Sequence, residues 1–329
     1  MAKVLTLSLN PALDLAIRLQ ELTPGAVNRT ESTRLDPAGK GVNVARVLVA
    51  LDHEVTVSGF LGAANDAAFR RAFADLGVED AFLRVPGETR INAKISEQDG
   101  RVTDINGPGM HIDREAFRRL VDDIDDRVAD PARRPDAVVI AGSLPPGVSP
   151  EDLASLIRHL RKQRLPVWVD TSGPALAAAI AIQPEECKPN AIKPNELELA
   201  AWAGETLNND AAWLRAAQRL HDSGIEEAMI SAGGDGVLWV SRRGIWLAMP
   251  PRVSVVSTVG AGDTLLAAML HGVLGDLPAE QALRLATALS AESVRHVGVG
   301  DPQAVDVDHL QQQTRVRHLN GADAKEARQ

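Results

Sequence analysis

The carboxylate of Asp263 directly follows three small residues, in the run Gly260-Ala261-Gly262-Asp263. The apolar stretch from Thr264 to Leu274 that comes next has the period of a helix. Small residues at the beginning of a helix leave its first N–H groups accessible, and these groups attract phosphate together with the helix dipole. Asp263 would then be placed to accept a proton from a hydroxyl group. An aspartate here is also a common helix N-cap, and this run alone does not decide between the two roles.

A second turn of small residues, Gly39-Lys40-Gly41, precedes a helical pattern from Val42 to Leu51. Gly39 and Gly41 allow the backbone to approach a ligand closely. Asn43 offers both a donor and an acceptor, as the recognition of sugar hydroxyls requires. The turn is not a Walker A loop, because the spacing and the Ser or Thr after the Lys are missing, and no run has the dinucleotide fingerprint G-x-G-x-x-G with its acidic partner. A dehydrogenase therefore has no support beyond the general architecture.

Strand-like apolar runs alternate with stretches of helical period along most of the chain, and this alternation predicts the elements that must position both turns. Strands are predicted at residues 4–9, 55–60, 137–141, 167–170, 191–193 and 228–231. Helices are predicted at residues 42–51, 67–76, 114–127, 152–162, 196–203, 210–221, 264–274 and 279–294. Such alternation is typical of a parallel sheet covered by helices on both faces.

Two segments break the alternation, at residues 13–35 and 89–106. The first has strand-like pieces around 15–19 and 27–33, and the second has the hairpin signal Asp99-Gly100. We expect a small β-sheet, a lid, inserted into one α/β domain of residues 1–310; an edge extension of the main sheet is the alternative. The polar tail at 311–329 lacks apolar periodicity, and we expect it to be frayed.

The composition excludes several classes of protein. The 329 residues carry a net charge of -9, which argues against nucleic-acid or anionic-membrane partners. The longest apolar runs, such as 175–182, are too short to span a bilayer, and the N-terminus lacks the features of a signal peptide. The single cysteine, Cys187, excludes intrachain disulfides and cysteine-based metal clusters, and the eight histidines show no metal-ligand spacing. These observations are typical of a cytoplasmic enzyme.

The chain resembles the PfkB branch of the ribokinase-like sugar kinases over roughly residues 1 to 310. Six motifs match that family in order and spacing: Asn10-Pro11-Ala12-Leu13-Asp14, residues 39–43, residues 141–147, residues 193–198, residues 231–236 and residues 260–263. The resemblance implies a three-layer α/β/α sandwich with a mostly parallel sheet and a small β-sheet lid. It also implies an ATP-dependent kinase that acts on a sugar phosphate.

The resemblance implies a role for each matching residue at the nucleotide end of the site. Asp263 would take the proton from the acceptor hydroxyl, while the backbone N–H groups of Gly260, Ala261, Gly262 and Asp263 would stabilise the transferring phosphoryl group. Lys193 and Asn195 would lie near the ATP phosphates, and Glu198 would hold Mg²⁺ through water. The nucleotide loop would consist of Ser231, Gly233, Gly234 and Gly236, and a monovalent-cation loop or adenine pocket of Ser257, Val259 and Ser290.

At the sugar end, the resemblance places Asp14 on two hydroxyl groups and Gly39 and Asn43 on another side of the ring. Arg90 and Arg29, one on each lid segment, would form a clamp for the sugar's phosphate. Lys40 would supply a further cation and Ser143 a hydroxyl contact. An exposed Arg on a hairpin is usually a solvated edge charge, so only the joint placement of the two arginines supports the clamp.

The stretches 24–29 and 89–95 look most like the 1-phosphofructokinase members of the family. We therefore expect phosphorylation of fructose 1-phosphate at its 6-hydroxyl to give fructose 1,6-bisphosphate. Tagatose-6-phosphate kinases and minor 6-phosphofructokinases share most of these residues and remain alternatives. A non-catalytic sugar-phosphate sensor is disfavoured, because base, anion turn and metal motif are all present. The uncovered lid predicts a homodimer formed through it, in which Arg29 would reach toward the neighbouring site.

Overall fold

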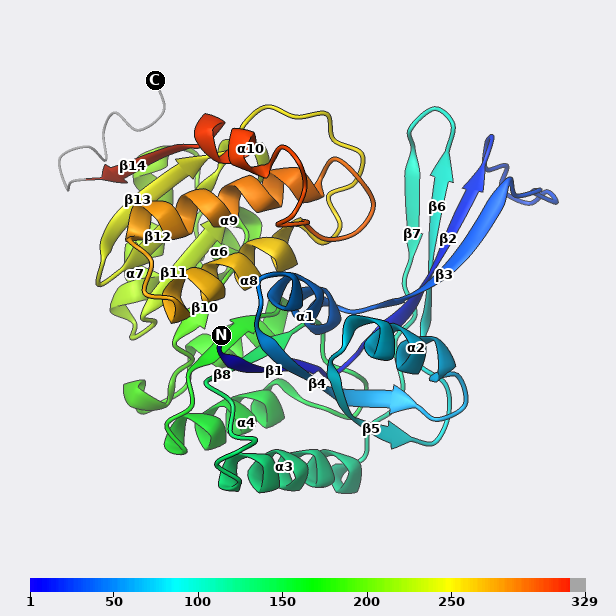
Figure 1. Cartoon of the computed structure of the whole chain (residues 1–329), viewed down its shortest axis with the longest axis horizontal. Coiled ribbons are helices and arrows are strands. Elements are labelled where there is room, and N and C mark those ends of the chain that lie inside the picture. The colour runs from blue at the N-terminus through cyan, green and yellow to red at the C-terminus, as the bar shows by residue number, and fades with distance from the viewer. Residues whose placement is uncertain (320–329) are drawn as a thin grey trace.

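A ten-stranded sheet forms the centre of the molecule in the computed structural model, which describes residues 1–319 apart from the side chain of Asp210 (Figure 1). The strand order is β14-β13-β12-β11-β10-β9-β8-β1-β4-β5. Seven strands run parallel: β11 (Glu227–Ser231), β10 (Ala191–Ile192), β9 (Val167–Asp170), β8 (Ala137–Ala141), β1 (Lys3–Ser8), β4 (Glu54–Gly62) and β5 (Glu79–Val85). Three antiparallel strands complete one edge: β12 (Val237–Ser241), β13 (Gly244–Met249) and β14 (Arg315–Leu319).

Helices cover both faces of this sheet, because its central strands are apolar on both sides. Along β8, for example, Val138 and Ile140 belong to one core cluster, while Val139 and Ala141 belong to the other. The first cluster includes residues of α3 (Arg114–Ala129), α4 (Pro150–Lys162), α5 (Gly173–Ile180), α6 (Glu196–Ala203) and α7 (Asp210–Asp222). The second includes residues of α1 (Lys40–Ala50), α2 (Ala67–Leu76), α8 (Ala261–Leu274), α9 (Ala279–Ser293) and α10 (Val307–Gln313). The predicted three-layer fold is confirmed.

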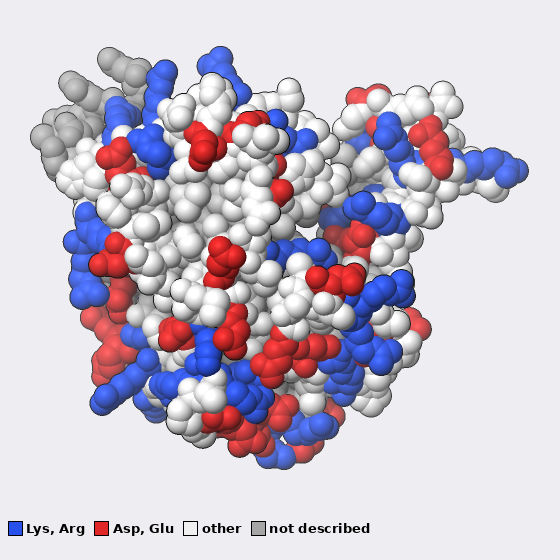
Figure 2. All heavy atoms as spheres, in the orientation of Figure 1, with Lys and Arg blue, Asp and Glu red and all other residues white. Residues whose placement is uncertain are grey.

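A separate four-stranded sheet projects from this body, as Figures 1 and 2 show. Its strands are β3 (Ser32–Ala38), β2 (Ala12–Leu19), β6 (Ile91–Glu97) and β7 (Val102–Ile105), in the order β3-β2-β6-β7. It draws on the two segments that break the alternation, and the edge-extension alternative is wrong. The central pair β2 and β6 is parallel, and the outer pairs are antiparallel.

Strand β3 of this sheet begins later than the sequence pattern predicts. The sequence pattern places a strand at 27–33, whereas β3 begins at Ser32 and Val27 is exposed in the preceding loop. The reason is local, because the side chain of Asn28 bonds to the backbone of Thr23 and Ala26 and closes the chain into a turn. At its other end, β3 leads through Gly39 into α1.

Residues 311–319, which the sequence predicts to be frayed, are ordered instead. They include the end of α10 and all of β14, which pairs with β13 in the register Val316↔Ala248. Two apolar side chains, Val316 and Leu319, pack at the sheet edge, and Arg284 donates to the carbonyls of Gln311 and Thr314. The predicted fraying of 320–329 lies outside the described residues.

Two further observations concern the surface and the helices. No helix in residues 1–319 is long and apolar enough to cross a membrane. On the face shown in Figure 2, basic and acidic side chains are interspersed, without a large area of either sign. A continuous basic patch of the kind that binds nucleic acid is therefore absent from that face.

Candidate active site

A cavity of about 440 Å³ lies where the carboxyl ends of β1, β8, β9 and β10 meet the N-termini of α1 and α8. Ligands of α/β proteins bind at this edge of a sheet. The predicted site residues that line it are Asp14, Gly39, Lys40, Asn43, Arg90, Ser143, Lys193, Val259, Gly260, Gly262 and Asp263. A somewhat larger cavity of about 520 Å³ beside Arg161 and Cys187 contains none of the predicted residues.

Asp263 lies in the first turn of α8 and is 5% exposed. The helix N-cap is Gly260, and the side chain of Asp263 makes no capping bond, so the N-cap interpretation is wrong. Instead, Oδ2 of Asp263 accepts a 2.8 Å hydrogen bond from Nδ2 of Asn43. Burial and the nearby charge of Asp170 raise the pKa of Asp263 to about 6, although Lys40, Asn43 and Lys193 act in the opposite direction. A carboxylate with this pKa suits a general base near neutral pH.

The two glycines of the turn before Asp263 have different surroundings. Gly260 has φ +88, and a Cβ atom there would lie 2.4 Å from the carbonyl oxygen of Gly298. A Cβ atom on Gly262 would lie 3.1 Å from Nζ of Lys193, so the lysine ammonium group is adjacent to the helix N-terminus. The free N–H groups at the N-terminus of α8 and the ammonium group of Lys193 therefore lie close together, and this arrangement suits an anion such as a phosphate.

Asp170, at the end of β9, is a site residue that the sequence motifs do not predict. It is 2% exposed, and its Oδ1 lies 3.1 Å from Nζ of Lys40 while its Oδ2 lies 3.3 Å from Nζ of Lys193. Burial alone would raise the pKa of Asp170, but the two ammonium groups lower it below its ordinary value. The signal was present in the sequence, since a polar residue at the carboxyl end of a buried parallel strand faces the ligand edge of the sheet.

Lys40 is expected from the sequence to supply a cation for the sugar phosphate, but its surroundings in the structure are different. It lines the cavity, but its ammonium group is paired with Asp170. Burial lowers the pKa of Lys40, yet the charges of Asp170 and Asp263 outweigh this effect and raise it. Lys40 is thus a charged partner of both buried carboxylates.

Arg90 lies where the small sheet joins the body. Its guanidinium group donates to the carbonyl oxygens of Asn10 at 2.8 Å, Pro11 at 3.3 Å and Gly107 at 2.9 Å. The hydroxyl of Ser143 is 3.5 Å from the same group and accepts a 3.2 Å bond from Nδ2 of Asn10. Arg90 and Ser143 are thereby held side by side at the cavity wall.

Asp14 faces the same cavity from β2, and the small sheet supplies its partners. The strand register pairs Asp14 with Asn92, whose Nδ2 donates a 3.0 Å bond to Oδ1 of Asp14. Nζ of Lys94 lies 3.7 Å from Oδ2 of Asp14. Asn92 and Lys94 lie in the stretch 89–95 that the family resemblance includes, but sequence motifs do not predict their contact with Asp14. That contact depends on the pairing of strands from distant segments.

Of the predicted nucleotide residues, Lys193 and Val259 line the cavity. The others, Asn195, Ser231, Gly233, Gly234, Gly236, Ser257 and Ser290, do not. Ser231 forms a β-bridge with Asn195, two residues after the lining residue Lys193. Ser290 donates a 3.1 Å hydrogen bond to the carbonyl of Ala261, and Ser257 accepts one of 3.2 Å from the N–H of Val259. The turn between β11 and β12 contains Gly233, Gly234 and Gly236.

Among the residues predicted to bind the sugar phosphate, Arg29 is the one that does not line the cavity. It is exposed in the loop of residues 20–31, at the outer end of the projecting sheet (Figure 1). The cavity lining in the described part of the chain includes Arg90 but not Arg29. A clamp made of both arginines is therefore not formed within one chain.

The model of the pfkB family of carbohydrate kinases matches residues 7–305. The chain belongs to this family. A 1-phosphofructokinase from Vibrio cholerae is 44% identical over 320 residues, which are 96% of this chain and 97% of the relative. A 1-phosphofructokinase from Escherichia coli K12 is 42% identical over 298 residues, which are 91% of this chain and 93% of the relative.

Solved structures agree with this family assignment. Phosphofructokinase-2 from Escherichia coli in complex with fructose-6-phosphate has a TM-score of 0.84 at 28% identity, covering 95% of this chain and 99% of that one. The same protein has been solved in complex with potassium and in a tetrameric inhibited form. As a pfkB carbohydrate kinase, the chain is a sugar-phosphate kinase that uses ATP and a divalent metal.

The residues near the cavity fit a metal that arrives with the nucleotide. Glu198 accepts a 2.9 Å bond from the N–H of Asn195, and its charge contributes to the raised pKa of Lys40. Within residues 1–319 no three His, Cys, Asp or Glu side chains are grouped closely enough to hold a metal by themselves. Mg²⁺ commonly keeps several waters and binds through one or two carboxylates plus substrate phosphates. A single carboxylate such as Glu198 is compatible with this mode.

Proposed function

We propose that the chain transfers the γ-phosphoryl group of ATP to the 6-hydroxyl of fructose 1-phosphate, giving fructose 1,6-bisphosphate and ADP. The observation that carries the proposal is the buried carboxylate of Asp263, which lines one cavity together with Lys193, Asp14 and Arg90. Relatives named 1-phosphofructokinase at 42% and 44% identity support the choice of substrate.

In the proposed reaction the 6-hydroxyl oxygen attacks the γ-phosphorus of ATP, and the bond to the bridging oxygen of ADP breaks. The hydroxyl proton passes to the carboxylate of Asp263, which is ionised above a pKa of about 6. The backbone N–H groups of residues 260–263 and the ammonium of Lys193 stabilise the charge on the phosphoryl oxygens. Positioning and electrostatics of this kind supply most of the catalysis in phosphoryl transfer.

The sugar phosphate is proposed to lie against the small sheet. Asp14, Asn43 and Gly39 would contact its hydroxyl groups, since all three line the cavity from β2 and the α1 turn. Arg90 and Ser143 would bind the 1-phosphate, and the guanidinium group is well suited to this because it contacts phosphate oxygens bidentately. In this pose the guanidinium group of Arg90 would give up at least one of its hydrogen bonds to backbone carbonyls and donate to a phosphate oxygen instead.

The nucleotide is proposed to lie along the rim next to Lys193. Asn195 would contact its phosphates, Glu198 would hold Mg²⁺ through water, and Mg²⁺ would neutralise phosphate charge. The adenosine would lie on the loop of Ser231, Gly233, Gly234 and Gly236. Ser257, Val259 and Ser290 would form the adenine pocket or a monovalent-cation loop. The solved complex of phosphofructokinase-2 with potassium supports the binding of a monovalent cation.

We also propose that two copies associate through the small sheet, in a cytoplasmic enzyme. In the strand register, Leu35, Leu15, Ala93 and Ile105 share one face, while Asp14, Asn92 and Lys94 share the other. The polar face serves the cavity, so the apolar face is left for a partner. Arg29 would approach a cavity only from a second copy. The single cysteine is consistent with a reducing compartment.

A panel of sugar phosphates tests the substrate. We expect the highest kcat/KM with fructose 1-phosphate, compared with fructose 6-phosphate and tagatose 6-phosphate at saturating ATP and Mg²⁺. A higher kcat/KM with either of the other two would reject the assignment but retain the kinase. The absence of ATP-dependent turnover with all three would favour the sensor alternative.

A further inference from the structure

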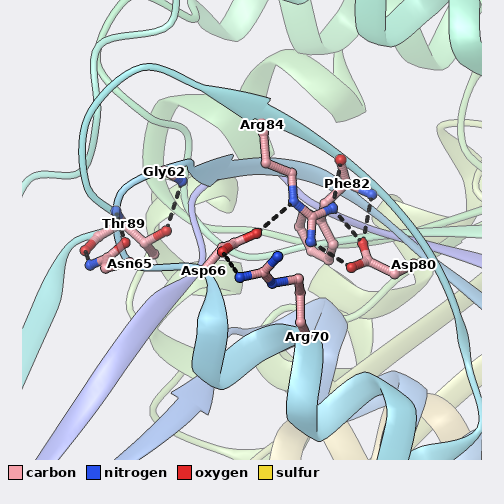
Figure 3. Close-up of polar contacts among 8 residues, drawn as sticks. All are labelled: Gly62, Asn65, Asp66, Arg70, Asp80, Phe82, Arg84 and Thr89. Atoms are coloured by element: carbon pink, nitrogen blue, oxygen red, sulfur yellow. Dashed lines mark hydrogen bonds and ion pairs between the residues drawn. The ribbon is translucent and has the colours of Figure 1, made fainter.

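The boundary between the two sheets falls between Thr89 and Arg90. On the side of the body, the turn that follows β4 holds Thr89, which is 1% exposed. Oδ1 of Asn65 accepts a 2.8 Å bond from the N–H of Thr89, and Nδ2 of Asn65 donates a 2.9 Å bond to its carbonyl (Figure 3). The hydroxyl of Thr89 accepts a 2.9 Å bond from the N–H of Gly62. The N–H, carbonyl and hydroxyl oxygen of Thr89 are thus all hydrogen-bonded to Gly62, at the end of β4, or to Asn65 in the turn that follows.

The same turn is bonded to the rest of the segment that leads to Thr89. The N–H of Ala63 donates to the carbonyl of Val85 at 2.9 Å, and the N–H of Ala64 donates to that of Gly87 at 3.0 Å. A Cβ atom on Gly62 would lie 2.3 Å from the nitrogen of Thr89, so the two backbones are in direct contact. Asn65 therefore completes a continuous row of bonds between this turn and residues 85–89.

Ion pairs fix the turn to the body on its other side. Asp66, which is buried, lies 3.1 Å from Nε of Arg84 on β5 and 3.2 Å from Arg70 on α2 (Figure 3). Arg84 also pairs with Asp80. The carboxylate oxygens of Asp66 pair with these two arginines, and the side chain makes no capping bond to α2. The turn that carries Asn65 is thus anchored at both ends.

Arg90 directly precedes β6 of the small sheet. Its carbonyl accepts a 2.8 Å bond from the N–H of Leu13 on β2, and its guanidinium group contacts the carbonyls of Asn10, Pro11 and Gly107. Its backbone position is therefore set by the small sheet on one side and by the bound Thr89 peptide on the other.

We propose that Asn65 is a positioning residue that places Arg90 for the phosphate of the sugar substrate, an inference that rests on the proposed function. Asn65 lines no part of the cavity and touches Thr89, so it acts through Arg90. A carboxamide matches both groups of a peptide unit, whereas Asp offers only acceptors and would face the Thr89 carbonyl with a negative charge. The pairing aligns Arg90 before substrate arrives.

A double-mutant cycle tests this inference, with Asn65→Ala, Arg90→Ala and the double variant. The matched control is Asn190→Ala, since Oδ1 of Asn190 accepts a 2.9 Å bond from the N–H of Val167, at the opposite end of β9 from the cavity. KM for the sugar phosphate, KM for ATP, kcat and Tm are measured for each. If Asn65→Ala folds poorly, Asn65→Asp, which keeps the acceptor for the Thr89 N–H, takes its place.

We expect Asn65→Ala to raise KM for fructose 1-phosphate by roughly tenfold, with KM for ATP nearly unchanged. In the Arg90→Ala background the same substitution should change KM by less than about twofold. Equal increases in both backgrounds, or a KM for Asn65→Ala that matches Asn190→Ala at similar Tm, would overturn the positioning role. If the panel selects another sugar phosphate, the cycle is run with that compound, so that failure of the substrate assignment is seen separately from failure of the Asn65 role.

Discussion

Nδ2 of Asn43 donates a 2.8 Å hydrogen bond to Oδ2 of Asp263 across 220 residues of sequence. The bond joins the first turn of α1 to the first turn of α8. Each turn is a separate small-residue motif in the sequence, and the structure brings them into one cavity. Because the donor is neutral and fixed on a helix, Asn43 orients the carboxylate without neutralising it.

Asp263→Asn should lower kcat by about 10² to 10⁴, the range for loss of a general base. The asparagine oxygen can still accept the bond from Asn43, so the cavity should keep its shape and KM for the sugar phosphate should change little. Steady-state kinetics on both substrates measures the effect, with circular dichroism as the control for folding. A kcat within tenfold of the wild type would remove Asp263 from the role of base.

The same substitution should make the protein more stable at alkaline pH. The pKa of Asp263 is about 6 in the folded protein against an ordinary value of 3.8, so ionisation of this carboxylate disfavours folding. This free-energy cost of folding is absent below pH 3.8 and reaches its full size above pH 6, the approximate pKa of Asp263 in the folded protein. Asp263→Asn should therefore raise Tm by roughly 5 °C at pH 8, and the gain should disappear as the pH approaches 4. A gain that is independent of pH would show that the ionisation of Asp263 is not its cause.

Two neighbouring substitutions should move the pH dependence of catalysis in opposite directions. In the wild type, kcat/KM for the sugar phosphate should fall as the pH decreases through about 6, because Asp263 becomes protonated. Asp170→Asn removes a negative charge that raises the pKa of Asp263, and should shift this limb to lower pH. Lys40→Met removes a positive charge that lowers it, and should shift the limb to higher pH. Shifts of the same sign in both variants would contradict the electrostatic account.

Local sequence patterns predict the two helix turns and six of the seven parallel strands of the large sheet, because buried parallel strands and small-residue turns have strong local signals. They do not predict the parallel strand β5 or the antiparallel strands β12, β13 and β14. Asp170 shows what they omit. Its importance comes from two lysines at positions 40 and 193, which meet only when β9 lies beside β10 and α1 packs over the sheet. Strand β14 was not predictable for a similar reason. Its two apolar residues, Val316 and Leu319, pack only because the strand pairs with the edge of β13.

The small sheet shows a different limit. Its strands are visible in sequence, but the pairing of β2 with β6 decides that Asp14 lies beside Asn92, and no local pattern fixes that register. Likewise, a family motif suggests a cationic role for Arg29 without indicating which copy of the chain would use it. The sequence therefore predicts which residues belong to the site better than it predicts which residues they contact.

A matched pair of substitutions on β7 tests association through the small sheet. Ile105 and Val102 are 58% and 59% exposed, but the strand register places Ile105 opposite Ala93 and Val102 opposite Ser96, on the two different faces. A charge buried in an apolar interface is costly, so Ile105→Lys should weaken the dimer at least tenfold, by about 1.4 kcal/mol or more. Val102→Lys adds the same charge to the same strand outside the proposed contact and should leave the dimer intact. Sedimentation equilibrium at micromolar concentration measures both, and a monomeric wild type, or equal effects of the two lysines, would reject this interface.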